Sequence, residues 1–348
     1  MALEISFYPY KLPLIAAWPG MIRNPMRFRE GWVVKAKEHN CSGIGDCAPF
    51  QAFGTESKRE AHRFLLQCAG NTWPDSAALL GKLEKQRSEY PASCFALETA
   101  LLDLESRKAD LPLRKMLNSK SSDNARVNAL SGSICDENTL SSIESGFNVI
   151  KLKVGKQAVE EELACLKALC RKLPPQHLLR LDANGAWSLD EARYFLAASQ
   201  GLPIESLEEP LRETGLAAFA DLQNQTDITL ALDESLKNLD LNEVLTNPTI
   251  RRLVLKPGVQ GGLCCTLALA ESAAAAGKES VITTLVDSAI GVQATCQLAA
   301  ATDPLSPGLA HGLATSDWLS KDIAKPPEIR AGYVFLSDTP GLGIHETF

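Results

Sequence analysis

The sequence predicts an α/β protein in which a (β/α) barrel follows a smaller α+β domain. From about residue 125 onward, short apolar runs alternate with amphipathic segments of helical length. Four runs end in a charged residue, 26, 25 and 23 residues apart, which is about the length of one strand–helix unit: Asp182, Glu208, Asp233 and Lys256. Catalytic groups of such barrels come from the C-terminal ends of several strands, so these residues mark the expected site.

Composition narrows the class of protein. A net charge of −7 disfavours a nucleic-acid binder. No apolar run approaches the ~20 residues of a membrane span, and residues 1–4 show no secretion-signal pattern. The ten cysteines include no Cys-x-x-Cys pair, and the five histidines form no zinc-ligand cluster. We therefore expect a cytoplasmic protein whose cysteines are reduced, mostly buried thiols.

Residues 1–120 are predicted to form the α+β domain. An alternating strand from Glu4 to Leu12 precedes a hairpin that turns at His39–Asn40. Between them, Pro19 to Arg29 reads as a loop with three arginines, either a lid or a surface loop. Helices are predicted at 56–69, 75–87 and 91–107. A polar linker at 118–124 ends the domain.

Residues 125–320 are predicted to form the barrel. An open doubly wound sheet is the competitor, but it would need a Gly-rich phosphate loop after its first strand, and the sequence has none. The segment 321–348, with a strand at 332–336, is expected to rejoin the first domain. The expected strands are 126–131, 148–153, 178–182, 204–208, 228–233, 251–256, 280–284 and 308–311, and the clearest helices are 157–172, 188–200, 261–277 and the Ala-rich 289–301 inside the outer ring.

Three carboxylates end consecutive strand units, at Asp182, Glu208 and Asp233. One acidic residue at a strand end is commonly a helix cap. Three in succession favour a set of hard oxygen ligands, which suits Mg²⁺ or Mn²⁺. The sequence therefore predicts a divalent-metal site.

Lysines flank these carboxylates on two strands. Lys151 and Lys153 lie two apart in one strand, so they share a face, with Lys153 at the barrel mouth and Lys151 one layer deeper. Repulsion and burial are expected to lower the pKa of Lys153 enough for it to act as a general base. Lys256 ends the strand across the mouth. Together these groups predict proton abstraction beside a metal-bound carboxylate, followed by reprotonation or by elimination.

Five motifs resemble those of the enolase superfamily, muconate-lactonizing-enzyme subgroup: Lys151-Leu152-Lys153, Asp182-Ala183-Asn184, Glu208-Glu209-Pro210, Asp233-Glu234-Ser235 and Lys256-Pro257-Gly258. The resemblance implies a modified, (β/α)7β-like TIM barrel with a capping domain. It also implies that Glu208 rather than Glu209 binds the metal and that Lys153 is the acid/base, with Lys256 as second lysine and Lys151 and Asn184 in support.

Two further stretches, 53–57 and 311–315, resemble the o-succinylbenzoate synthases of menaquinone and phylloquinone biosynthesis. These dehydrate a small-molecule carboxylate, 2-succinyl-6-hydroxy-2,4-cyclohexadiene-1-carboxylate. The resemblance places Thr283, Thr284 and Gly312 near the succinyl tail. Asp287-Ser288 stands where many relatives have Glu-Ser, which bears on the pocket contacts.

Three alternatives stay open at this point. An N-succinylamino acid racemase would use the same two lysines. A dipeptide epimerase is disfavoured, because Ala310-His311-Gly312-Leu313 stands where an Asp-x-Asp motif is expected. A non-catalytic barrel would have another residue in at least one of the five catalytic motifs, and all five motifs are intact. The sequence leaves the oligomeric state undecided.

Overall fold

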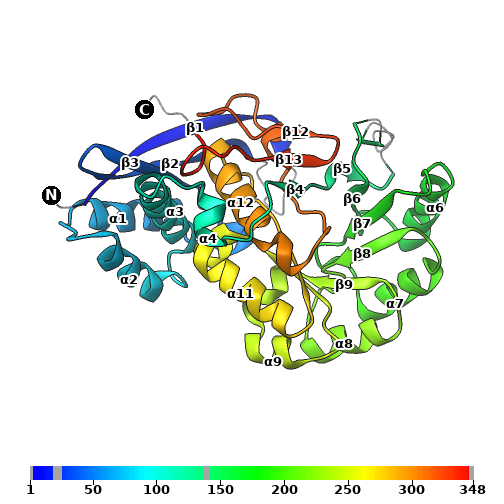
Figure 1. Cartoon of the computed structure of the whole chain (residues 1–348). Helices are drawn as coiled ribbons and strands as arrows, with labels where there is room; N and C mark the ends of the chain where they lie inside the picture. The colour runs from blue at the N-terminus through cyan, green and yellow to red at the C-terminus, as the bar shows by residue number, and fades with distance from the viewer. Residues whose placement is uncertain (1–2, 19–25, 136–141, 144, 345–348) are drawn as a thin grey trace.

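The computed structural model describes residues 3–18, 26–135, 142–143 and 145–344. In Figure 1 the N-terminal strands and helices, in blue and cyan, lie on one side, and the green barrel units lie on the other. Yellow and orange helices lie between them, and the red C-terminal segments run across the top toward the N-terminal strands.

The N-terminal region is an antiparallel sheet covered by helices. The sheet has the order β1 (Glu4–Trp18), β2 (Met26–Glu38) and β3 (Cys41–Cys47), and it turns at His39–Asn40 as predicted. Ser57 begins the first helix with a capping box to Glu60, and Asp75 caps the second. The helices are α1 (Lys58–Ala69), α2 (Ser76–Gln86), α3 (Pro91–Lys108) and the short α4 (Leu113–Leu117).

The predicted loop from Pro19 to Arg29 is partly wrong. Strand β2 begins at Met26, so Arg27 and Arg29 are strand residues. Arg27 is exposed, whereas Arg29 is only 2% exposed, because it turns inward to backbone carbonyls. Residues 19–25, including Arg23, lie outside the described residues.

The second sheet is a curled, all-parallel array with the strand order β11-β10-β9-β8-β7-β6-β5. Its apolar runs are buried on both faces, as expected for parallel strands covered by helices. The strands are β5 (Ala129–Ser133), β6 (Val149–Lys153), β7 (Leu178–Asp182), β8 (Ile204–Glu208), β9 (Thr229–Leu232), β10 (Arg252–Leu255) and β11 (Glu279–Ile282). The helices are α6 (Val159–Cys170), α7 (Leu189–Ala198), α8 (Leu216–Asn224), α9 (Leu241–Thr246), α10 (Pro257–Gln260), α11 (Leu263–Ala275) and α12 (Ala289–Thr302).

The eighth predicted strand, 308–311, is not a strand in the described part of the chain. Single bridges replace it: His311 pairs with Val127 before β5, and Gly312 pairs with Thr283 after β11. Pro307 precedes this stretch and Gly308 begins it, and such residues weaken strand pairing. The two edges of the sheet are therefore joined by backbone bridges.

Helix α12 lies where the two regions meet. All of its residues are buried, as its Ala-rich sequence predicted, and it contacts β3 and α4 of the N-terminal region as well as α11. The predicted first barrel strand is divided, because β4 (Asn124–Arg126) pairs instead with β13 (Tyr333–Phe335), which also pairs with β12 (Ile329–Arg330). Beyond β13, the Gly341 carbonyl accepts from the Leu113 backbone at 2.8 Å.

The cysteine expectation needs one correction. Cys135, just after β5, and Cys165 of α6 form a disulfide, although the other eight cysteines are free. The pair is 30 residues apart in sequence, and the tertiary structure brings the two Cα atoms to 5.5 Å. Among the described residues, no helix combines the length and the apolar character needed to span a membrane.

Candidate active site

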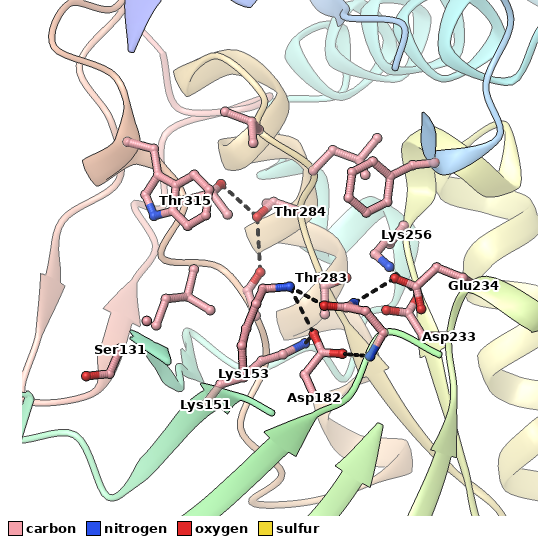
Figure 2. A pocket seen from close by; sticks show the side chains of 18 of the residues that line it. Ser131, Lys151, Lys153, Asp182, Asp233, Glu234, Lys256, Thr283, Thr284 and Thr315 are labelled. Carbon is pink, nitrogen blue, oxygen red and sulfur yellow. Dashed lines mark hydrogen bonds and ion pairs between the residues drawn. The ribbon is translucent and has the colours of Figure 1, made fainter. Parts of the chain in front are cut away.

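The charged strand ends meet at one end of the parallel sheet. In the register, Lys153 of β6 lies beside Asp182 of β7, and Asp182 lies beside Glu208 of β8. Asp233 and Lys256 directly follow β9 and β10. Except for Glu208, which lies deeper, these side chains line a cavity of about 380 Å³. Figure 2 shows the lysines and carboxylates turned toward one another in this cavity.

Each lysine contacts its own acceptor. Lys151 Nζ donates to Glu208 and lies 3.0 Å from Asp182 Oδ2. Lys153 Nζ donates to Asn184 Oδ1 and lies 3.7 Å from Asp182 Oδ2. The Lys153 side chain is 40% exposed and that of Lys151 only 14%, so Lys151 lies a layer deeper, as the strand period predicts.

The second lysine lies on the other side. Lys256 donates to Asp233, and its Nζ is 5.4 Å from the Phe53 ring centroid. Burial lowers the pKa of both Lys151 and Lys256, but nearby carboxylates outweigh burial and raise both above the ordinary value. For Lys256 these carboxylates are Asp233 and Glu234. The structure therefore keeps both ammonium groups charged.

The three carboxyl groups differ from one another in pKa. Burial raises the pKa of Asp182, but the charges of Lys151 and Lys153 lower it further, to a net value below the ordinary range. Burial raises the pKa of Glu208 against the opposing charge of Lys151, and it raises that of Asp233 to about 6 against the opposing charge of Lys256; neighbouring carboxylates add to both shifts. Burial is therefore the main reason that these two carboxyl groups hold a proton more readily than Asp182 does.

Do these residues fit a divalent cation? No set of three His, Cys, Asp or Glu side chains converges at ligand geometry among the described residues, since lysine ammoniums lie between the carboxylates. Their chemistry nevertheless fits. Asp182, Glu208 and Asp233 offer hard oxygens from adjacent strands. Beside them, Glu234 Oε2 is buried without a hydrogen-bond partner among the described residues. A cation bound here would offset the negative charge of these oxygens.

Asn184 and Glu209, in the loops after β7 and β8, form hydrogen bonds with residues of the site. Asn184 Oδ1 accepts a hydrogen bond from Lys153 Nζ, and Asn184 Nδ2 donates a hydrogen bond to Glu234 at 3.0 Å. Glu209 accepts from the Asp233 backbone N–H at 2.9 Å and from Ser235 Oγ at 2.9 Å. The chain thus turns Glu208 into the barrel interior and Glu209 toward the backbone after β9.

The three predicted substrate residues also line the cavity. Thr283 Oγ1 is buried, with no hydrogen-bond partner among the residues that the structure describes. Thr284 Oγ1 donates to the Gly312 carbonyl at 3.1 Å. A Cβ on Gly312 would lie 2.8 Å from Thr283 Cγ2, so only glycine fits this wall.

Sequence reasoning missed the rest of the lining. Glu234 could have been found from its place beside Asp233, but the others lie in loops or in β5 without a charge pattern to distinguish them. The apolar residues among them are Leu130, Leu285, Val286 and Trp318, and the polar ones are Ser131, Ser133 and Lys156.

The chain is similar to known proteins along most of its length. The enolase C-terminal domain-like family model matches residues 136–346, and the MenC N-terminal domain model matches residues 3–104. The o-succinylbenzoate synthase of Yersinia pseudotuberculosis serotype I is 29% identical over 327 residues, which cover 92% of this chain and 93% of that protein.

Solved structures share the fold over nearly the whole chain. A dipeptide epimerase from Enterococcus faecalis V583, complexed with Mg and L-Leu-L-Tyr, has a TM-score of 0.86 at 22% identity, covering 99% of this chain and 100% of that one. The N-succinyl Arg/Lys racemase from Bacillus cereus has 0.87 at 20%, with 100% and 96% covered. A muconate lactonizing enzyme from Pseudomonas fluorescens, complexed with muconolactone, has 0.83 at 22%, with 99% and 96% covered.

The fold and the family match define an enzyme of the enolase type. The chain belongs to the enolase superfamily, because the enolase C-terminal domain-like model matches more than half of it.

Proposed function

We propose that the protein is an o-succinylbenzoate synthase, a hydro-lyase that dehydrates 2-succinyl-6-hydroxy-2,4-cyclohexadiene-1-carboxylate. One observation carries the proposal. Two lysines from separate strand ends, Lys153 and Lys256, face one cavity beside buried carboxylates. The choice of substrate is supported by the o-succinylbenzoate synthase relative and by the MenC match in the N-terminal region.

Lys153 is the proposed general base. Among the three lysines at the strand ends, its side chain is the most exposed, at 40% against 14% for Lys151 and 12% for Lys256. In its neutral form it would remove the proton on the carbon beside the substrate carboxylate and then protonate the departing hydroxyl as water. Asn184 accepts a hydrogen bond from this Nζ and so sets its direction.

Lys256 is the proposed electrostatic partner. It stays charged between Asp233 and the Phe53 ring, and from there its ammonium can stabilise the negative charge that develops on the substrate as the proton leaves. Its position is set by β10, which ends just before it, and by α10, which begins at Pro257.

Asp182, Glu208 and Asp233 are the proposed ligands of a divalent cation, with Mg²⁺ favoured and Mn²⁺ an alternative. When bound, the cation would act as a Lewis acid on the substrate carboxylate. Lys151 would balance the charge of Asp182 and Glu208 beneath it. Thr283, Thr284 and Gly312 line the part of the cavity proposed for the succinyl tail.

The test is direct turnover of the cyclohexadiene substrate with Mg²⁺ present. Formation of o-succinylbenzoate supports the proposal, and the absence of product with a folded, metal-loaded protein contradicts it.

An N-succinylamino acid racemase is the second candidate. Two lysines on separate strands suit proton removal on one side and return on the other, and the racemase from Bacillus cereus shares the fold. Incubation with N-succinyl amino acids in deuterated water separates the two. Exchange at the α-carbon without dehydration activity favours the racemase, whereas dehydration without exchange removes it.

A further inference from the structure

One buried arginine joins two segments that form the cavity wall. Arg29 of β2 donates from Nε to the Val286 carbonyl at 2.6 Å and from Nη1 to the Pro49 carbonyl at 2.8 Å. Its Nη2 donates to the Ala48 carbonyl. Val286 lines the cavity after β11, and residues 48–49 lead into the loop that carries Phe53 to the cavity. Arg29 itself does not reach the cavity lining.

The same guanidinium reaches Lys256 through two aromatic rings. Arg29 Cζ lies 5.0 Å from the Phe50 ring centroid, and the Phe50 and Phe53 centroids are 4.7 Å apart. Lys256 Nζ in turn lies over the Phe53 ring. The position of the Phe53 loop against the second lysine therefore depends on a side chain of the N-terminal sheet.

A second contact fixes the segment after β11. Asp46 of β3 accepts from Ser288 N at 2.9 Å and Ser288 Oγ at 2.8 Å. Gly291 permits this approach, since a Cβ there would lie 2.9 Å from Asp46 Oδ2. Residues 286–288 are thus held twice by the N-terminal sheet. The hydrogen bonds of the three lysines, by contrast, lie within the barrel, although Lys256 also packs against Phe53.

We propose that Arg29 is a positioning residue that fixes the substrate-binding wall of the cavity by joining segments 48–53 and 283–288. A guanidinium can satisfy three carbonyls at fixed angles because it is a planar fork of five donors. Lysine, with one ammonium, cannot reproduce this arrangement. The kinetic part of this inference rests on the proposed function, because it assumes that the wall binds the part of the substrate remote from the lysines.

The first test is steady-state kinetics of Arg29→Lys on the cyclohexadiene substrate. We expect KM to rise about tenfold or more while kcat stays within about threefold, because a loosened wall removes binding that substrate and transition state share. Arg27→Lys is the matched control: Arg27 lies two residues away on the same strand and is exposed. A merely structural role would leave the KM of the folded fraction unchanged, and that result would overturn the proposal.

The second test does not need the substrate. Hydrogen exchange of Arg29→Lys should quicken together at segments 48–53 and 283–288 and stay unchanged at the ends of β6 and β10. Phe50→Leu, which keeps Arg29 and removes only the ring, should give the same pattern more weakly. Unchanged exchange at 283–288 in both variants contradicts the proposal. An inactive parent protein would count against the proposed function alone, because this exchange pattern still decides the role of Arg29.

Discussion

The two halves of the cavity are built in different ways. One half, from β6 to β10, consists of charged side chains at strand ends, each held by a neighbouring strand. The other half, in β5, after β11 and around Phe53, is mostly apolar or neutral and is shaped by loops and by the N-terminal sheet. The difference teaches that charge and reactivity come from the sheet, whereas the shape of the pocket comes from packing between regions.

The largest expected effect lies in the charged half. Lys153→Ala should lower kcat by about 10³-fold, within the usual range for loss of a general base, while Mg²⁺ binding persists because the carboxylates remain. Turnover and calorimetric titration of Mg²⁺ measure the two properties. Lys167→Ala, an exposed residue of α6, is the control. Retained activity in Lys153→Ala would remove the role assigned to this lysine.

Metal removal tests the carboxylates next. A chelator should abolish turnover, and Mg²⁺ should restore it. Mg²⁺ at 100 times its Kd should stabilise the folded parent by about 2.7 kcal/mol and raise its Tm. Glu208→Gln should lose most of this shift, and Glu209→Gln should keep it, since Glu209 turns to backbone groups. The opposite ranking of these two variants would reverse the assignment made from the Glu-Glu-Pro motif.

In the neutral half, effects should be smaller and fall on binding. Gly312→Ala places a Cβ 2.8 Å from Thr283 Cγ2, so the wall must shift. We expect kcat/KM to fall by about tenfold, mainly through KM. A kcat loss as large as that of Lys153→Ala would show that this half also takes part in proton transfer, and the comparison would fail.

The last prediction concerns stability, not turnover, where the two regions meet. Burial, followed by the charge of Asp46, raises the pKa of Asp287 to about 7, against opposing contributions from Arg29 and the Leu285 N–H. Because the folded protein holds the Asp287 proton more tightly than the unfolded chain does, this carboxyl group contributes its full stability below about pH 4. This stability is lost as pH rises toward 7. Tyr10, hydrogen-bonded to Asp46 at 2.6 Å, completes the group.

Asp287→Asn should therefore unfold less readily than the parent at pH 8, by at most roughly 4 kcal/mol, and should lose this advantage at pH 4. Urea unfolding at the two pH values measures the difference. An equal difference at both values would show that Asp287 does not titrate in this range.

Much of the barrel could be predicted from the sequence because period and charge are local signals. The seven described strands of the sheet fall within about two residues of seven predicted ones, except at the first, where β4 leaves to pair with β13. The prediction of the eighth strand was wrong, because residues 311–312 make only single bridges, to Val127 and Thr283. The local sequence does not specify these distant partners.

By itself, the sequence determined the order of the strands, the charged residues that end them and the layering of Lys151 below Lys153, since these follow from a two-residue period and a regular repeat. Only the tertiary structure decided that Arg29 turns inward, that Cys135 meets Cys165, and that Glu209 turns to the backbone beside Asp233. These outcomes depend on contacts between residues distant in sequence, and no local pattern specifies such contacts.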